Sequence, residues 1–426
     1  MKIQSVDAFQ IFDSRGNPTL EAVVTLDTGE VGHGLVPSGA STGQFEAHEL
    51  RDGDMAKFRG RSVYRAIDHV RSEIAHAVRG RDVLDQRGID EAMIVLDGTP
   101  TKSRLGANAI LGVSMAVAQA AARVRRVPLF RSLGEGTLLP LPEVQVFGGG
   151  AHAQWRTDVQ DFLVIATGAR NYAETLEITF EVFHVAAEIM KKRGKLAGCA
   201  DEGGYWPDFS TNEEALETFS EAVARAGFTP GKEASLSLDI AASDLYDPDT
   251  ETYRFALEGR KFTSSEFIDL MIRWCRDYHI VSIEDPAADT DWDGWERFYG
   301  ACGESVQVIG DDLFTTSLSR IREGIERGIA NSVLIKLNQI GTVTETLDAI
   351  KVTQGAGWAP VVSARSGETE DAFISHLAVA TNAGQLKVGS FCRSERMVKW
   401  NECLRIERAL GTDAKFLGRE ILKHSP

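Results

Sequence analysis

The chain of 426 residues is long enough for two or three domains and a large hydrophobic core, and its composition, 43% hydrophobic and 25% charged, is typical of a soluble globular enzyme. The formal net charge of −16 argues against a nucleic-acid partner, because binding to a phosphate backbone requires a basic surface. The five cysteines include no CxxC pair, so the sequence predicts neither a disulfide framework nor a zinc site. Neither a signal peptide nor a segment of transmembrane length is evident, so a cytoplasmic protein without a membrane partner is expected.

The first part of the chain predicts three strands followed by helices. Residues 3–10 and 20–26 alternate apolar and polar side chains around the turn-rich segment DSRGNP, which is typical of an antiparallel hairpin, and GEVGHGLVP supplies a third strand. The loop at residues 38–54 is dense in Gly, Ser and Thr, so it is either a ligand-binding loop or a flexible connection. An α+β domain is therefore expected, which ends near the proline-rich segment LLPLPEV. Its helical patterns lie at residues 61–79, 88–95 and 106–125.

The rest of the chain alternates short apolar runs with stretches that are compatible with helices. Apart from the first interval, these runs recur about every 25 residues, which is typical of parallel βα units. With two earlier runs, at residues 143–147 and 160–166, they predict an α/β fold with an eight-stranded TIM-type barrel. A doubly wound open sheet is the alternative, but no GxGxxG motif follows a strand to support it. The six repeated runs end at Asp239, Glu284, Asp311, Lys336, Ala364 and Lys387.

Charged side chains stand at most of these predicted strand ends. In a parallel barrel, the carboxyl ends of the strands all open on the face that holds the active site. Three carboxylates at one mouth fit a hard cation such as Mg²⁺, which prefers oxygen ligands. A lysine beside cations would have a lowered pKa and could act as a neutral general base. For each residue alone, a solvated charge or a helix N-cap is the alternative; the set is Asp239, Glu284, Asp311, Lys336 and Lys387.

Together these residues predict the removal of a proton α to a carboxylate, with the metal neutralising the aci-carboxylate that forms. Such a reaction also requires an acid on the opposite wall to eject the leaving group. Glu202, in the glycine-flanked segment ADEGGYWP, is the candidate acid, and an ordinary DEGG turn is the alternative.

Long motifs over nearly the whole chain resemble the enolase (phosphopyruvate hydratase) family. They are DSRGNPT, PSGASTG with ELRDGD, GANAILGVSMA, DEGGY, IVSIED, GDDLF, ANSVLIKLNQIGT, RSGETEDAFI and RSER. The resemblance implies an N-terminal α+β cap domain, residues 1–135, and a modified barrel of ββαα(βα)₆ order, residues 136–426. A lysine base beside Mg²⁺ is an established arrangement in the enolase superfamily. The resemblance also implies two Mg²⁺ ions per active site and a homodimer or an octamer.

The resemblance assigns a role to each residue that matches a family motif. Lys336 is then the general base and Glu202 the general acid. An arginine suits the phosphate group of the substrate, because its guanidinium fork matches the geometry of an oxyanion. The other implied roles are Asp239, Glu284 and Asp311 as ligands of the first Mg²⁺, Ser41 as the mobile-loop ligand of the second, Arg365 and Ser366 as the phosphate-binding pair, Lys387 as a cation beside the substrate carboxylate or the metal, and His152 as the lid-loop histidine.

Several departures from the family pattern cluster at this expected site. Ala364 replaces the histidine before RSGETED, and Gly148 replaces the asparagine of the NGG motif. The QEF motif is QDF here, so that Asp161 follows Gln160 with a side chain one methylene shorter. The lid loop continues as AQWRTDV, which places Arg156 among residues that are usually small.

Because the predicted base, acid and metal ligands are kept, these departures favour a changed substrate over simple drift. The loss of an imidazole at Ala364 makes room for a larger substrate, and Arg156 adds a positive charge that suits an extra anionic group. Gln160 and Asp161 are expected to bind the substrate together with these two residues. The sequence therefore predicts a specialised enzyme similar to carboxyphosphonoenolpyruvate synthase of phosphonate and phosphinate antibiotic biosynthesis, with a small anionic phosphorylated or phosphonylated substrate. The alternatives are an ordinary enolase, which dehydrates 2-phosphoglycerate to phosphoenolpyruvate, and a catalytically inactive enolase-like binding protein.

Overall fold

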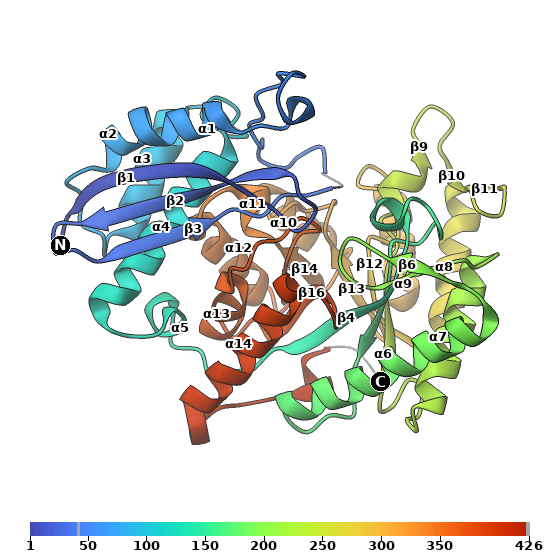
Figure 1. The fold of residues 1–426 in the computed structure, drawn as a ribbon. Helices are drawn as coiled ribbons and strands as arrows, with labels where there is room; N and C mark the ends of the chain where they lie inside the picture. The colour runs from blue at the N-terminus through green and yellow to red at the C-terminus, as the bar shows by residue number, and fades with distance from the viewer. Residues whose placement is uncertain (41–42, 423–426) are drawn as a thin grey trace.

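The structure is a computed structural model that describes residues 1–40 and 43–422. Figure 1 shows the N-terminal sheet and its helices, in blue, packed beside a barrel that the remainder of the chain forms. The two parts are joined by backbone hydrogen bonds: the N–H of Ser38 donates to the Gly367 carbonyl oxygen at 2.8 Å, and the N–H of Ser14 donates to that of Glu368 at 2.8 Å.

The N-terminal sheet is antiparallel and follows the predicted hairpin. Asp13 closes its first turn, because the Asp13 Oδ1 atom accepts hydrogen bonds from the backbone N–H groups of Arg15 at 2.9 Å and Asn17 at 2.8 Å. Side-chain acceptance of this kind is the reason that aspartate favours turns. The strands lie in the order β1 (Ile3–Phe12), β2 (Pro18–Leu26) and β3 (Val31–Leu35).

Helix α4 (Ala107–Arg125) packs closely against this sheet. Gly34 in β3 permits the contact, because a Cβ atom at this position would lie 2.0 Å from the carbonyl oxygen of Gly112 in α4. The predicted helix at residues 61–79 is divided by a π-helical turn at Val70–Ile74. The helices on either side of this turn are α1 (Tyr64–His69) and α2 (Ala75–Val78), and α3 (Gln86–Asp97) follows them.

Contrary to the expectation from sequence, α4 is long and apolar enough to cross a membrane by length and composition alone. It is the one such helix within residues 1–40 and 43–422, and 83% of its apolar window is buried inside the protein. The alanine-rich composition of α4 therefore serves packing against the sheet, as in the core helix of a folded domain.

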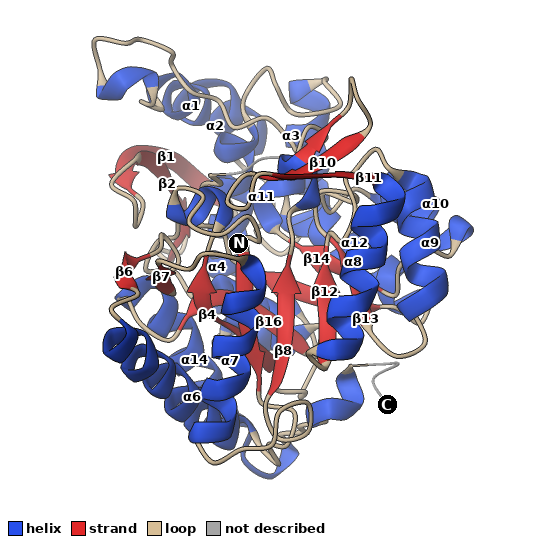
Figure 2. Cartoon of the chain, turned by 90° about the vertical axis from the view of Figure 1, so that its right-hand side faces the viewer, coloured by secondary structure: helices blue, strands red, loops and turns tan. Residues whose placement is uncertain are grey.

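The barrel closes because its last strand pairs with its first. The second strand, β5, is antiparallel to both neighbours, whereas the later strands run parallel to one another. In Figure 2 these strands run through the centre of the molecule with helices around them. The strands are β4 (Leu141–Gly148), β5 (Asp161–Ile165), β8 (Ser235–Asp239), β12 (Ile280–Glu284), β13 (Gln307–Gly310), β14 (Ser332–Ile335), β15 (Ala359–Ser363) and β16 (Gln385–Ser390).

The order of strands and helices confirms the predicted α/β fold with a modified ββαα(βα)₆ barrel, and it excludes the doubly wound sheet. The helices that cover the barrel are α6 (Tyr172–Arg193), α7 (Asn212–Arg225), α8 (Ser264–Asp277), α9 (Trp292–Cys302), α10 (Leu318–Arg327), α12 (Val343–Gly355), α13 (Phe373–Ala380) and α14 (Ser394–Leu410). Helix α5 (Leu129–Leu133) ends shortly before the boundary at residues 135 and 136, which stays a prediction.

A hairpin and one short separate sheet are added to this plan. The hairpin of β6 (Leu196–Cys199) and β7 (Tyr205–Pro207) extends the barrel sheet at β4, and its connecting loop carries Glu202. A separate antiparallel sheet is inserted before α8 and consists of β9 (Tyr246–Asp247), β10 (Thr252–Phe255) and β11 (Arg260–Thr263).

The interior of the barrel below its mouth contains a buried polar network. Gln385 Nε2 donates a hydrogen bond to Glu143 Oε1 at 2.7 Å, and the Ser237 hydroxyl donates to Glu143 Oε2 at 3.3 Å. Burial raises the pKa of the Glu143 carboxyl to about 7, although the nearby charge of Lys387 opposes this shift. A carboxyl thus titrates near neutral pH in the centre of the barrel.

Candidate active site

The mouth of the barrel holds a small, mainly polar cavity. The parallel register aligns the strand ends, so that the last residue of β12, Glu284, lies beside the last residue of β8, Asp239. The cavity lies at the carboxyl ends of the strands, as the sequence predicts for an active site in a parallel barrel. The predicted site residues that line it are His152, Gln160, Asp161, Glu202, Asp239, Asp311, Lys336, Ala364, Arg365, Ser366 and Lys387.

Lys387 is held among carboxylates at the centre of the mouth. Its Nζ atom donates hydrogen bonds to Glu284 Oε2 at 2.6 Å and to Asp239 Oδ2 at 2.7 Å, and it lies 3.6 Å from Asp161 Oδ2. Burial alone would lower the pKa of Lys387, but the charges of Asp239 and Glu284 raise it well above its ordinary value. Lys387 is therefore a fixed cation.

Lys336 has a different environment, with one close carboxylate. Its Nζ atom lies 2.5 Å from Asp311 Oδ2. Burial opposes the charged form, but Asp311 outweighs it and raises the pKa of Lys336, while the positive charges of Arg365 and Lys387 lower this pKa. The lowered pKa that the sequence predicts is thus not produced by the protein's own groups, because the interaction of Lys336 with Asp311 is stronger than its interaction with either cation.

The carboxylates at the mouth fit a divalent cation. Glu284 is 2% exposed, and its Oε1 atom has no hydrogen-bond partner within the described residues. Burial and the negative charge of Asp239 raise the pKa of Glu284 well above its ordinary value. Glu284 interacts electrostatically with both Asp239 and Asp311. Carboxylate oxygens are the ligands that Mg²⁺ prefers, so the chemistry of Asp239, Glu284 and Asp311 suits this ion. Gln160 supports the set, since its Nε2 atom donates to Asp239 Oδ2 at 3.1 Å.

Two further aspartates at the mouth were not singled out from sequence. Asp285 accepts hydrogen bonds from the backbone N–H groups of Asp311 at 3.0 Å and Asp312 at 2.8 Å, and it adopts a left-handed conformation with φ of 43°. Asp285, Asp311 and Asp312 have carboxylate oxygens within 4.8 Å of one another. The doubled acids of the IED and GDD motifs are the signal that could have identified them, and Asp285 fixes the turn that presents Asp311.

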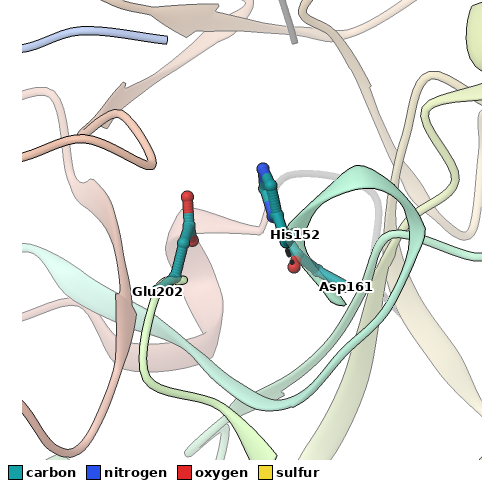
Figure 3. Close-up of side chains that lie close together, drawn as sticks. All are labelled: His152, Asp161 and Glu202. Atoms are coloured by element: carbon teal, nitrogen blue, oxygen red, sulfur yellow. Dashed lines mark ion pairs between the residues drawn. The ribbon is translucent and has the colours of Figure 1, made fainter. Parts of the chain in front are cut away.

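The opposite side of the cavity is formed by His152, Asp161 and Glu202, which lie close together in Figure 3. His152 Nδ1 lies 3.5 Å from Asp161 Oδ1, so the contact is mainly electrostatic. Burial would lower the pKa of His152, but the charges of Glu202 and Asp161 raise it. Burial opposes the charged form of Asp161, yet its interactions with His152 and Lys387 lower its pKa to about 2. Asp161 therefore reaches both partners with its shorter side chain.

The substitution at Gly148 has a packing explanation. A Cβ atom at this position would lie 2.5 Å from the Cβ atom of Ala200, at the start of the loop that carries Glu202. The neighbouring Gln145 joins the two sides of this region: its side-chain amide donates to Asp161 Oδ1, and its Oε1 atom accepts from the backbone N–H of Gly204 at 2.8 Å. Gly148 thus lets the Glu202 loop pack closely against β4.

Arg365 and Ser366, which the sequence predicts as a phosphate-binding pair, line the cavity. Arg365 is 4% exposed and donates to Glu46 Oε2 at 2.9 Å and to Asn338 Oδ1 at 2.9 Å. The Ser366 hydroxyl is buried and has no hydrogen-bond partner within the part of the chain that the structure describes. An unsatisfied hydroxyl in a cavity is costly unless a ligand pairs with it, which fits an oxyanion at this position. Glu46 was not identified from sequence.

Arg156 is the one predicted substrate-binding residue that lies away from the cavity. Its guanidinium donates a hydrogen bond to Asp208 at 2.7 Å and lies 5.5 Å from the ring centroid of Trp206, and its side chain is 43% exposed. Arg156 is not among the residues that line the cavity. Ser41, the predicted ligand of a second Mg²⁺, lies outside the described residues, and its role stays a prediction.

Comparisons with known proteins agree over almost the entire chain. A family model described as "Enolase, N-terminal domain" matches residues 3–133, and a model described as "Enolase, C-terminal TIM barrel domain" matches residues 136–425. A protein named Enolase 1 from Desulfitobacterium hafniense (strain Y51) is 53% identical over 423 residues, which are 99% of this chain and 97% of that protein.

The predicted specialisation toward carboxyphosphonoenolpyruvate synthesis is wrong. Identity of 53% with Enolase 1 over nearly the full length supports an ordinary enolase. It does not support a role in phosphonate or antibiotic biosynthesis. The structure gives a physical reason for the error, since Arg156 pairs with Asp208 outside the cavity and Asp161 keeps its contacts with His152 and Lys387. The departures in sequence therefore leave the charges of the cavity largely unchanged, apart from the imidazole that Ala364 lacks.

Proposed function

This chain belongs to the enolase family and is a lyase of the enolase superfamily, and we propose that it dehydrates 2-phosphoglycerate to phosphoenolpyruvate as an ordinary phosphopyruvate hydratase. One observation carries the proposal: a lysine and a glutamate that suit proton transfer, Lys336 and Glu202, line the same cavity although they lie far apart in the sequence. A binding protein without catalytic activity would have no need of this pairing.

Lys336 is the group that removes the proton from C2 of the substrate. Mg²⁺ is the cofactor of the family, and when it is held by Asp239, Glu284 and Asp311 it would neutralise charge on the substrate carboxylate and on the ligands themselves. Neutralisation of Asp311 weakens the interaction that raises the pKa of Lys336, while Lys387 and Arg365 continue to lower that pKa. The neutral amine is then accessible as a base.

Glu202 is the group that donates a proton to the departing C3 hydroxyl, which leaves as water. The carboxyl lies beside His152, whose positive charge is favoured by Glu202 and Asp161. The loop around Glu202 is held firmly, because the backbone N–H of Ser390 donates to the Glu202 carbonyl oxygen at 2.9 Å and Gln145 binds Gly204. An acid in a fixed position raises the rate, since small displacements of reacting groups are costly.

The remaining side chains of the cavity position the substrate. Arg365 and Ser366 would bind the phosphate group, and Lys387 would lie on the side of the carboxylate. The expectations of a cytoplasmic location, of a homodimer or octamer, of two Mg²⁺ ions per site and of the domain ranges 1–135 and 136–426 stay predictions.

Turnover of 2-phosphoglycerate tests this proposal. We expect the purified protein to form phosphoenolpyruvate in the presence of Mg²⁺, as followed by the ultraviolet absorbance of the enol ester. A chelator should abolish the activity, and added Mg²⁺ should restore it. A folded protein that forms no phosphoenolpyruvate with Mg²⁺ present would refute the proposal.

A further inference from the structure

Two of the five cysteines flank the loop that carries Glu202. All five cysteines are free thiols, and two of them, Cys199 and Cys392, interact with each other and contact the same turn. The Cys199 sulfur lies 3.6 Å from the Ala200 carbonyl oxygen, and the Cys392 sulfur lies 2.9 Å from the Gly203 carbonyl oxygen. Cys199 is the last residue of β6 and is exposed, whereas Cys392 follows β16 and is partly buried. These two thiols belong to segments that are far apart in the sequence, and the fold brings them together beside the active site.

An arginine is fixed beside the exposed thiol. Arg393 donates to the carbonyl oxygen of Ser14 at 2.9 Å and to Glu395 Oε1 at 2.9 Å, and it also forms a hydrogen bond with Cys199. The interaction with Cys392 lowers the pKa of Cys199 to about 6 against the effect of burial, and Arg393 lowers it further. An exposed thiolate beside a guanidinium is the environment of a reactive cysteine.

We propose that Cys199 and Cys392 form a reversible disulfide when Cys199 reacts with a hydroperoxide, and that this disulfide slows turnover by displacing the Glu202 loop. Cys199 is the attacking thiol because it is exposed. Cys392 is the resolving thiol because it is within reach of Cys199 and less accessible to solvent. This inference concerns a modification site and does not depend on which substrate the enzyme dehydrates.

The chemistry balances with one molecule of hydrogen peroxide. The Cys199 thiolate attacks one peroxide oxygen, the O–O bond breaks, and the departing hydroxide takes up a proton to become water. Cys199 is then a sulfenic acid. The Cys392 sulfur attacks the Cys199 sulfur and loses its proton, and the sulfenic oxygen leaves as a second water. The two thiols lose two electrons, and the peroxide gains them.

The disulfide would act on the active site through Gly203. The Cys392 thiol donates a hydrogen bond to the Gly203 carbonyl oxygen at 2.9 Å, next to Glu202. Formation of the disulfide removes this donor and ties the start of the Glu202 loop to the segment after β16. Space is limited, because a Cβ atom at Gly203 would lie 3.1 Å from the Cys392 sulfur. A change at these sulfur atoms is therefore transmitted to the backbone of Glu202.

A second pair of cysteines provides an internal control. Cys275 in α8 and Cys302 in α9 also interact with each other, but both are buried, and burial together with Cys302 raises the pKa of Cys275 well above its ordinary value. They lie beside Ile280, at the beginning of β12 and thus at the end of the barrel away from the cavity. This pair tests whether proximity of two thiols alone produces the effect.

Graded hydrogen peroxide treatment of the Mg²⁺-loaded enzyme tests the proposal. Free thiols are alkylated after treatment, and the digested protein is examined by mass spectrometry for a peptide cross-linked between residues 199 and 392. We expect the cross-linked peptide to accumulate while turnover falls by about tenfold or more, the size of effect that a misplaced catalytic group produces. Dithiothreitol should restore both the thiols and turnover.

Three variants complete the experiment. Cys199→Ser and Cys392→Ser should retain turnover and resist peroxide, and the serine at 392 can still donate to the Gly203 carbonyl oxygen. Cys302→Ser should respond as the unmodified enzyme does. Absence of the 199–392 peptide at peroxide doses that consume the Cys199 thiol, or full turnover in the cross-linked enzyme, would overturn the proposal. If the enzyme did not use 2-phosphoglycerate, the cross-linked peptide would still report on the cysteine pair.

Discussion

Two lysines at the barrel mouth, similar in sequence context, have different electrostatic environments because their neighbours differ. Lys387 is hydrogen-bonded to both Asp239 and Glu284, which hold it in the charged form. Lys336 has Asp311 alone at close range and two cations nearby that oppose its charge. A ligand that neutralises Asp311 therefore changes the proton affinity of Lys336 far more than that of Lys387.

Arg156→Ala tests the placement of this arginine outside the cavity. We expect the KM for 2-phosphoglycerate to stay within about twofold of the unmodified enzyme, because an exposed ion pair contributes little. Arg365→Ala should instead raise KM by about 10- to 100-fold, since a buried hydrogen bond to a charged group contributes roughly 1.5–3 kcal/mol. Steady-state kinetics of both variants provide the comparison. A large rise in KM for Arg156→Ala would show that Arg156 contacts the substrate.

At the scale of residues, the sequence identifies which groups are present but not which of them touch. The strand-end acids and lysines were predictable because their spacing follows the barrel repeat. The partners of Arg156 and Asp161 were not, because a side chain's direction depends on loop geometry that the sequence pattern does not encode. Arg365 and its partner Glu46 are separated by 319 residues, so no local pattern could join them.

At the scale of elements, regular alternation was the reliable signal. The three N-terminal strands and the barrel strands were predicted because they are apolar on at least one face. The short strands β6 and β9 were missed, since β6 is exposed throughout and β9 has only two residues. The loop that carries the proposed acid thus begins at a strand that hydrophobic periodicity cannot detect.

Close packing between β3 and α4 leads to a prediction at this scale. Gly34→Ala should lower the free energy of unfolding by about 1–3 kcal/mol, because the new methyl group would overlap the backbone of α4. Gly300→Ala is the matched control: this glycine lies within α9 with open space around its Cβ position, so alanine should be neutral or stabilising there. Urea unfolding of both variants measures the difference, and equal stabilities would contradict the close approach.

At the scale of the whole molecule, the buried carboxyl of Glu143 makes the stability of the barrel depend on pH. Its pKa rises from an ordinary value of 4.5 to about 7 on folding, so the folded protein binds a proton that the unfolded chain has released between these values. The free energy of unfolding therefore falls as pH rises through this window, by at most about 3 kcal/mol from this group, and is constant above it.

Glu143→Gln should remove this dependence while keeping a side chain that can bind Ser237 and Gln385. The free energy of unfolding of the variant minus that of the unmodified protein should be more positive at pH 8 than at pH 5. Urea unfolding of both proteins at the two pH values measures this difference. Glu188→Gln, at an exposed position on α6, is the control and should show no such difference. A stability difference for Glu143→Gln that does not change with pH would show that Glu143 is ionised throughout.

We propose that Lys336 removes the C2 proton and that Glu202 assists the departure of the C3 hydroxyl. Exchange of the C2 hydrogen of 2-phosphoglycerate with deuterated water, followed by NMR in the presence of Mg²⁺, separates these two steps. Glu202→Gln should retain exchange while dehydration falls by about 10²- to 10⁴-fold, the usual contribution of a general acid, and Lys336→Ala should lose both. The control Lys351→Ala, at an exposed position on α12, should retain both. Exchange that persists in Lys336→Ala would contradict the assignment of the base.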